Sequence, residues 1–318
     1  MDKIDRDIIK ELLIDSRVPI LRLAKKIRSS REVAAYRIKR LQKEGIIRDF
    51  ISEIDISKLG FMGAAVFVNV KATHQKEFKE YLEKSPFVSW VAELSGVWSF
   101  GLSIIGRTNE EIDSRFSELY LHFKDAIIDH RFTLHKKNHF FYEKYLGEKP
   151  FKIKTKMKEQ ISKIDDKDKV ILQELATDSR IDTLELSQKI RLTAPAVAAR
   201  IKRLKSAGII ERFSIFVDAS RLGLFQYSVF ITNKDVERKE ALISHLKDHP
   251  YVSFIAEYSG DPFIEFGVFV KNSYELRDIL QGIEEAFPSN RVIELSLFQK
   301  EFVSIKPPKC VFASSQAR

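Results

Sequence analysis

The 318-residue chain has almost no cysteine: Cys310 is the only one. One cysteine cannot form a disulfide within the chain, and it excludes metal sites built from several cysteines. This usage is typical of a reducing compartment, so we expect a cytoplasmic protein. The chain also lacks any run near the roughly 18 apolar residues of a membrane helix, and Met1 to Arg6 shows no secretory pattern. We therefore expect a protein that is neither secreted nor embedded in a membrane.

Catalytic motifs are absent as well. The sequence has no glycine-rich phosphate loop, no cysteine group and no useful spacing of serine, histidine and aspartate. We accordingly predict no enzyme activity, no cofactor and no metal site. Acidic residues are too few to balance the basic ones, because 45 Asp and Glu against 54 Lys and Arg leave a formal charge of +9. That surplus favours a polyanionic partner, above all a nucleic acid.

The chain does contain an internal duplication. Residues 2–60 align with residues 165–223 without a gap, and nearly half of the aligned positions are identical. The letters Arg-Ile-Lys-Arg-Leu at Arg37 to Leu41 return unchanged at Arg200 to Leu204. With 44% hydrophobic residues, the chain is long enough for a separate core in each copy.

Apolar residues recur at helical spacing in three segments near the start of each copy, which predicts three helices. The third helix of the first copy is expected to begin near Ser29 or Ser30, because Ser29 and Glu32 have the spacing of a capping box. Its counterpart is expected to begin at Thr193, a hydroxyl cap followed by a proline. The next segments have the composition of strands, over 46–54 and 209–217.

A short second helix followed by a basic third helix is the arrangement of a helix-turn-helix. On a helical wheel Ala34, Ile38 and Leu41 share one side, which leaves basic side chains on the other. Such side chains can reach phosphates and guanine edges in the major groove, although an ordinary solvated face has the same pattern. We predict that DNA is contacted by Ser30, Arg31, Tyr36, Arg37, Lys39, Arg40 and Lys43 of the first copy and by Thr193, Arg200, Lys202 and Arg203 of the second.

The two third helices are not expected to act alike. The pair Lys39 and Arg40 recurs in the second copy, whereas Tyr36 is replaced by Ala199. Phosphate contacts fix the register of a protein on DNA, and side chains early in a recognition helix meet base edges. Our hypothesis is that both copies hold the DNA backbone while the first copy reads more of the sequence.

The later part of each copy changes to strands rich in β-branched and aromatic residues, with two helices interleaved among them. The order is strand-helix-strand-strand-helix-strand, which is the ferredoxin-like arrangement. The predicted strands of the first copy are 64–70, 88–94, 98–105 and 127–134, and those of the second are 227–231, 252–258, 263–270 and 291–298.

Each copy resembles the Lrp/AsnC family, the leucine-responsive or feast/famine transcription regulators of bacteria and archaea. The most specific parts are the Arg-Ile-Lys-Arg-Leu motif with the following Gly-Ile-Ile, and residues 55–60, matched by 218–223. The resemblance implies an α+β fold of two tandem units, each a winged helix-turn-helix followed by a ferredoxin-like βαββαβ module. It also implies a sequence-specific transcription regulator with double-stranded DNA as its partner.

The expected organisation follows from this resemblance. Winged helix-turn-helix units are placed at 1–60 and 163–223, ferredoxin-like modules at 61–146 and 224–306, a basic linker at 147–162 and a disordered tail at 307–318. Because family members pair two identical chains, the resemblance implies an internal pseudo-dimer, with larger homo-oligomers left open. A linker raises the effective concentration of the second unit to the millimolar range.

The family's second module binds an amino-acid effector in many members, and it usually has a Gly-x-Tyr/Trp-Asp turn. Both glycines are present here, but neither copy has the acidic residue. The candidate effector residues are Gly96, Trp98, Ser99 and Gly260, with the alternative that Trp98 belongs to the core. The turn before the third helix usually has a glycine in the family, whereas this chain has Arg28 and Arg191 there.

Two other functions are kept as alternatives. Siroheme decarboxylases resemble the same family, and their catalysis depends on polar residues, including histidines, around a tetrapyrrole. His130, His135 and His139 lie close together in the sequence, and we favour a structural or surface role for them. The second alternative is an architectural protein that coats DNA through phosphate contacts without a defined operator.

Overall fold

The computed structural model describes residues 1–141, 144, 146, 164–233, 236–260, 263–303 and 307–313. The predicted linker, 147–162, lies outside the described residues. The chain forms two compact units, and each takes segments from both copies of the duplication. The helical unit comprises residues 1–61, 151–218 and 305–318, and the barrel unit comprises residues 62–150 and 219–304.

The helical unit contains the predicted three helices and one strand of each copy. The elements of the first copy are α1 (Lys3–Ile14), α2 (Ile20–Lys26), α3 (Arg31–Lys43), β1 (Ile47–Ile54) and η1 (Ile56–Leu59). Those of the second copy are α6 (Asp166–Thr177), α7 (Thr183–Ile190), α8 (Ala194–Ser206) and β6 (Ile210–Val217).

Local hydrogen bonds fix where α3 and α8, the third helix of each copy, begin. The hydroxyl of Ser30 accepts the backbone N–H of Val33 at 3.2 Å, so Ser30 is the N-cap of α3. The predicted capping box headed by Ser29 is therefore wrong by one residue. In α8 the prediction is confirmed, because Thr193 is the N-cap and proline occupies the first turn.

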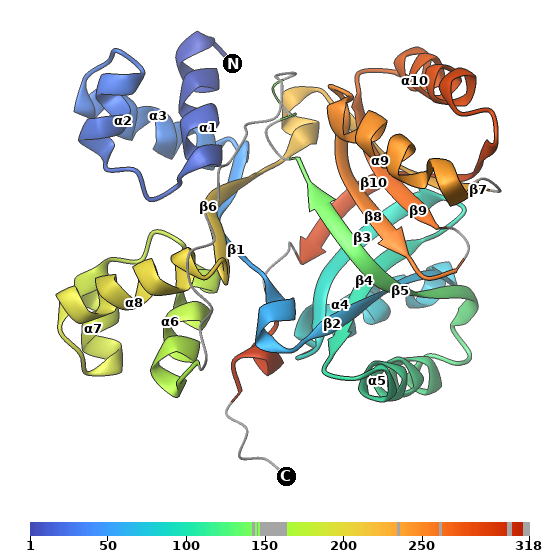
Figure 1. The fold of residues 1–318 in the computed structure, drawn as a ribbon, viewed down its shortest axis with the longest axis horizontal. Helices are drawn as coiled ribbons and strands as arrows, with labels where there is room; N and C mark the ends of the chain where they lie inside the picture. The colour runs from blue at the N-terminus through green and yellow to red at the C-terminus, as the bar shows by residue number, and fades with distance from the viewer. Residues whose placement is uncertain are drawn as a thin grey trace. The chain divides into compact units, whose positions relative to one another are not determined.

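The two copies are joined by their strands in the helical unit. β1 and β6 pair antiparallel, and they lie side by side next to both groups of three helices (Figure 1). α1 packs on β6 and α6 packs on β1, so each helix contacts the strand of the other copy. The buried hydroxyls of Ser16 and Ser179, equivalent residues of the two copies, are 2.7 Å apart. A single copy would leave these helix and strand faces uncovered.

The barrel unit contains the two predicted ferredoxin-like modules. The first has β2 (Met62–Val70), η2 (Ala72–His74), α4 (Gln75–Lys84), β3 (Val88–Gly96), β4 (Phe100–Gly106), α5 (Asn109–His122) and β5 (Ile127–Phe140). The second follows η4 (Ala219–Leu222) and has β7 (Phe225–Asn233), η5 (Val236–Arg238), α9 (Lys239–Asp248), β8 (Val252–Tyr258), β9 (Ile264–Val270), α10 (Ser273–Ala286) and β10 (Asn290–Val303).

The strands of both modules form one closed barrel in the order β10-β3-β4-β2-β5-β8-β9-β7. Strand β5 of the first module pairs with β8 of the second, and β10 pairs with β3. Both β5 and β10 are longer than the sequence predicts, because their distal halves gain hydrogen bonds from the other module. A closed barrel leaves no unpaired strand edge.

Apolar side chains fill the space between the modules. The rings of Phe67 and Phe230, which are equivalent residues, meet edge to face with their centroids 4.9 Å apart. Trp98 is buried in the same group, so the core alternative for this residue is confirmed. A second core lies in the other module, where buried residues of α9 and α10 pack with those of the strands.

The prediction of a disordered segment from Pro307 is wrong for residues 307–313. They include the short helix η6 (Lys309–Val311), and Val311 and Phe312 are buried. No helix in the described part of the chain is long and apolar enough to cross a membrane.

Candidate nucleic-acid interface

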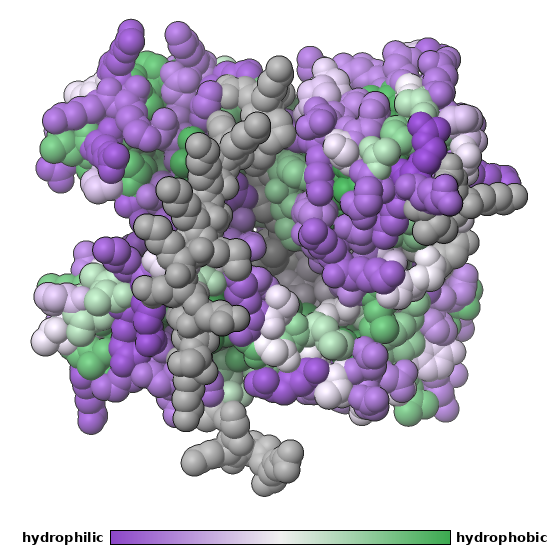
Figure 2. Space-filling view, viewed as in Figure 1, coloured by the Kyte–Doolittle hydropathy of each residue, from purple (hydrophilic) through white to green (hydrophobic). Residues whose placement is uncertain are grey.

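The exposed side of α3 is largely the one that the wheel predicts. Ala34, Ile38 and Leu41 are buried, whereas the Tyr36 ring is 66% exposed. Of the predicted DNA contacts in the first copy, Ser30, Arg31, Lys39 and Lys43 are also exposed. Figure 2 shows hydrophilic residues over much of the visible surface of the helices in both copies. This side of α3 combines one large aromatic ring with several free positive charges.

α8 carries no aromatic side chain. Val197 and Leu204 hold it to its core, and Thr193, Ala199 and Lys202 are exposed. Lys202 is the counterpart of Lys39, so both recognition helices carry an exposed lysine at this position. The tyrosine ring of the first copy has no equivalent, because a methyl group stands in its place.

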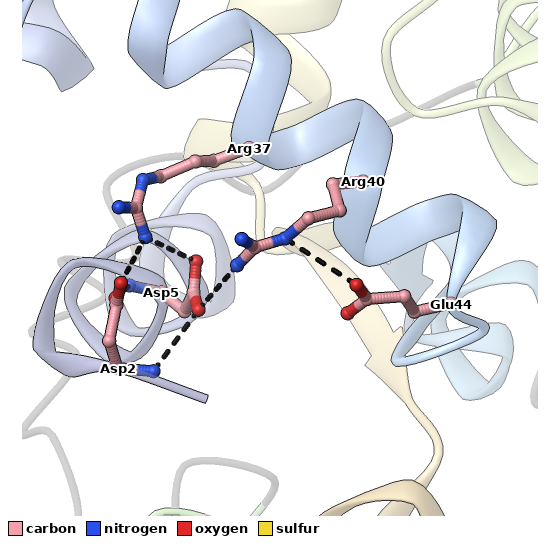
Figure 3. A network of polar contacts seen from close by, with 5 residues as sticks. All are labelled: Asp2, Asp5, Arg37, Arg40 and Glu44. Carbon is pink, nitrogen blue, oxygen red and sulfur yellow. Dashed lines mark hydrogen bonds and ion pairs between the residues drawn. The ribbon is translucent and has the colours of Figure 1, made fainter.

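The two arginines of the repeated motif are held by carboxylates of α1 (Figure 3). Arg37 Nη1 donates to Asp2 Oδ2 at 2.6 Å and to Asp5 Oδ1 at 2.9 Å, and Arg40 Nη2 donates to Asp5 Oδ2 at 2.6 Å. The Asp5 side chain is only 2% exposed. Arg40 Nε also lies 3.6 Å from Glu44 Oε1. The motif therefore ties the recognition helix to the start of α1.

The second copy repeats this arrangement. Arg200 Nη1 donates to Asp165 Oδ2 and to Asp168 Oδ1, both at 2.8 Å, and Arg203 donates to Asp168. Asp168 is fully buried. Ala207 stands at the position of Glu44, so the second network lacks that carboxylate.

The same aspartates also begin the first helices. The Asp2 carboxylate accepts the backbone N–H of Asp5, and the Asp5 carboxylate accepts the backbone N–H of Asp2. Asp165 and Asp168 form an identical capping box in α6. The hydrogen bond from Arg37, with that from the Asp5 backbone, lowers the pKa of Asp2 to about 2. Both carboxylates of each pair are thus fixed in place for the arginines.

This network was not predicted from the sequence. The wheel placed Arg40 on the free face, and the structure shows its guanidinium bonded to a buried carboxylate. The available signal was the recurrence of two aspartates three residues apart at the start of both copies. A DNA-contact role for Arg37, Arg40, Arg200 and Arg203 stays a prediction, beside the helix-positioning role that the hydrogen bonds give them.

Arg28 and Arg191 occupy the turns before the recognition helices. Both have φ of 53°, the left-handed region in which glycine is the least strained residue. Both side chains are exposed. A left-handed non-glycine residue costs on the order of 1 kcal/mol. The positive charges of both side chains lie shortly before the caps Ser30 and Thr193.

The predicted effector residues lie in tight turns of the barrel unit. Gly96 and Gly260 both have positive φ, of 124° and 106°. A Cβ atom added at Gly96 would clash with the carbonyl oxygen of Leu295, which would lie only 2.6 Å from it. Trp98 Nε1 donates to Glu294 Oε2 at 2.9 Å, and Ser99 Oγ bonds to Asn69. The first turn thus packs against the second module, and its effector role stays a prediction.

The three histidines have separate surroundings. His130 contacts Phe116 and Tyr120 of α5, whereas His135 contacts Tyr258 and His139 lies 3.4 Å from Glu257. Among the described residues, no group of three or more His, Cys, Asp and Glu side chains could hold a metal ion.

Comparisons with known proteins agree with this geometry. An AsnC-type helix-turn-helix model matches residues 1–42, and a winged helix-turn-helix DNA-binding model matches residues 164–211. The HTH-type transcriptional regulator LrpA of Bacillus subtilis is 34% identical over 132 residues, which cover 41% of this chain and 85% of that regulator. The chain belongs to the Lrp/AsnC family. DNA binding and transcription regulation are the general functions of this family.

One further relative matches part of the chain, and one solved structure matches nearly its whole length. The LrpA regulator of Pyrococcus horikoshii is 29% identical over 119 residues, covering 37% of this chain and 84% of its own. The siroheme decarboxylase NirDL has a TM-score of 0.64 over 95% of this chain and 93% of its own, at 16% identity. At 16% identity this likeness establishes a shared fold only. It does not assign the decarboxylase reaction to this chain.

Proposed function

We propose that this Lrp/AsnC chain is a sequence-specific regulator that binds double-stranded DNA as an internal pseudo-dimer. α3 and α8 enter successive major grooves as the two recognition helices. The observation that carries the proposal is the pairing within the helical unit, where β1 joins β6 and each first helix packs on the strand of the other copy. One chain then supplies the two recognition helices that two separate chains supply in dimeric regulators.

The two recognition helices, α3 and α8, have different roles in this proposal. Lys39 and Lys202 are exposed at equivalent positions and hold phosphates in both half-sites. Tyr36 projects from α3 near its beginning, where recognition helices meet base edges, and Ala199 cannot reach as far. The operator is therefore a pair of half-sites, of which the one under α3 is the more strictly defined. An amino-acid effector at this turn would have to compete with the hydrogen bonds that Trp98 makes to Glu294 and Ser99 makes to Asn69.

Exchanging the residues at the Tyr36 position tests this division. We expect Tyr36→Ala to lower discrimination between the correct and altered α3 half-sites by about tenfold, because a base-edge contact is lost. Ala199→Tyr is expected to change sequence preference only in the other half-site. The measurement is the dissociation constant on a set of half-site variants. Equal discrimination by both copies in the wild-type chain would contradict the proposal.

Lys39→Gln is the matched control for a phosphate contact. It should weaken binding to all DNA sequences alike and reduce the slope of log affinity against log salt by about 1. Tyr36→Ala should leave that slope unchanged. An architectural protein would instead show no discrimination for Tyr36→Ala to remove, and would bind competitor DNA as tightly as any selected site.

A further inference from the structure

A groove with aromatic walls lies between α4 and α5 on the first ferredoxin-like module. Its volume is about 570 Å³. Tyr81, Phe87 and Phe123 provide ring surface, and Glu77, Glu80 and Glu118 are carboxylates of the two helices that line it. The buried rings of Phe87 and Phe123 lie deep, whereas the three carboxylates are exposed.

Three of the rings that line the groove, those of Tyr81, His122 and Phe123, contact one another. Tyr81 stacks on His122 with centroids 4.9 Å apart, and Phe123 meets Tyr81 edge to face at 5.3 Å. A guanidinium already occupies one end, since Arg115 Cζ lies 5.4 Å from the centre of Phe87. Aromatic faces attract cations through the ring quadrupole. The groove is therefore suited to positively charged side chains.

The groove lining holds three carboxylates, those of Glu77, Glu80 and Glu118, against the two cations Lys84 and Arg115. Arg115 is paired with Glu111, outside the groove lining. Within the described part of the chain, no lysine or arginine forms an ion pair with Glu77, Glu80 or Glu118. The pKa of Tyr81 is raised, first by burial and then by the negative charge of Glu118. With Arg115 already paired, carboxylates outnumber the remaining cation Lys84, so the groove favours a cationic occupant over the phosphates of a nucleic acid.

The duplication supplies an internal comparison for this surface. In the second module, α9 and α10 have Ala241, Ser244 and Gly282 where α4 and α5 have the three glutamates. Tyr81 is replaced by His245 and His122 by Ala286. Both modules have the same helices and the same closed barrel. Forming the fold does not require the carboxylates, because the second module lacks them at all three positions.

We propose that the groove between α4 and α5 binds a lysine- or arginine-rich segment of a partner protein. Each carboxylate is exposed, and one exposed ion pair contributes little to binding. The three carboxylates lie on two helices with aromatic rings between them. They can bind one ligand at the same time only if that ligand carries several cations in one chain. A basic peptide segment meets that condition. This surface goes beyond DNA binding, since α4 and α5 belong to the barrel unit.

Titration with a hexa-arginine peptide tests the proposal on the full chain without DNA. The triple variant Glu77→Gln, Glu80→Gln and Glu118→Gln should bind the peptide about tenfold more weakly than the wild-type chain at low salt. The triple variant Glu240→Gln, Glu284→Gln and Glu285→Gln removes the same charge from exposed sites on α9 and α10, and should bind like the wild-type chain. Calorimetric titration measures both.

Two results would overturn the assignment. One is an equal loss of affinity in both triple variants, which would show that net charge alone attracts the peptide. The other is the absence of peptide binding to the wild-type chain at low salt. Thermal unfolding of each variant confirms that it is folded, and DNA affinity should stay unchanged in both. The result is therefore independent of the recognition helices.

Discussion

Asp168→Asn is expected to lower the free energy of unfolding by about 3 kcal/mol, because it leaves two guanidinium groups facing a neutral, buried amide. The Asp168 carboxylate is fully buried and bonds to both Arg200 and Arg203. It also accepts the backbone N–H of Asp165 in the capping box. Asparagine keeps the shape of the aspartate side chain, but its amide N–H groups face the N–H donors of the arginines and cannot accept hydrogen bonds from them. Urea unfolding monitored by circular dichroism measures the loss.

Asp166→Asn is the matched control on the same helix. The Asp166 side chain is 77% exposed. It forms an ion pair with Lys169, which lies three residues further along the same helix. Exposed pairs of this kind contribute at most about 1 kcal/mol, so the control should stay close to the wild-type chain. Similar values for the two variants would show that the network contributes nothing beyond an ordinary surface pair.

The network has a consequence for DNA recognition. Asp168 holds α8 to the start of α6 through two arginines, and Asp5 does the same for α3 and α1. A recognition helix must keep its angle to the rest of the domain in order to place several side chains in one groove. The repeated Arg-Ile-Lys-Arg-Leu motif thus combines two positioning arginines with one exposed lysine between them.

Glu265→Gln is expected to remove a pH-dependent loss of stability from the barrel unit. Glu265 is buried and accepts hydrogen bonds from the hydroxyls of Ser228 and Tyr258. Burial raises its pKa from 4.5 to about 7, against the opposing effect of the two hydroxyl donors. The equivalent position in the first module is Gly101. The second module therefore carries an ionisable group at a site where the first has none.

The direction of the effect follows from proton binding. Well below pH 4.5 Glu265 is protonated in both the folded and the unfolded chain, so it does not change the free energy of unfolding. Between pH 4.5 and about 7 the unfolded chain releases the proton while the folded chain keeps it, so stability falls as pH rises. The total is about 3 kcal/mol, and it changes little further at higher pH. The glutamine variant should therefore gain stability over the wild-type chain with rising pH.

The measurement compares unfolding free energies of the two proteins from about pH 4 to about pH 8, a range that covers the change. Other groups titrate as well: burial lowers the pKa of His135 to about 4, which makes stability rise with pH over part of the acid range. That contribution is common to both proteins and cancels in the difference. A difference that stays constant with pH would contradict the assignment of the proton to Glu265.

The sequence predicts local structure well where the signal lies within one copy. The Thr193 cap and the βαββαβ order are present in the structure, and the cap of α3 is Ser30, one residue from the predicted Ser29. The larger errors concern partners far away in the chain. β5 and β10 are longer than predicted because each pairs with a strand of the other module. A helical wheel likewise shows which side of α3 is free of the core, but it cannot show that Asp5 lies beside Arg40.

Two further features depend on contacts that the local sequence pattern does not show. Val311 and Phe312 are buried although the end of the chain has no helical or strand periodicity, since two apolar residues suffice to fix a short segment. From the sequence alone, Trp98 could belong either to an effector-binding turn or to the hydrophobic core. Its burial against the other module, with Nε1 bonded to Glu294, depends on a pairing that one copy alone does not reveal.

Selection of bound sequences from random double-stranded DNA by the full chain tests the pseudo-dimer proposal most directly. We expect two enriched half-sites about 10 base pairs apart, or a multiple of that spacing, because two recognition helices of one chain meet the same face of the duplex. One half-site should be more sharply defined than the other, because α3 carries Tyr36 where α8 carries Ala199. No enriched motif, a single half-site, or two half-sites of equal definition would contradict it.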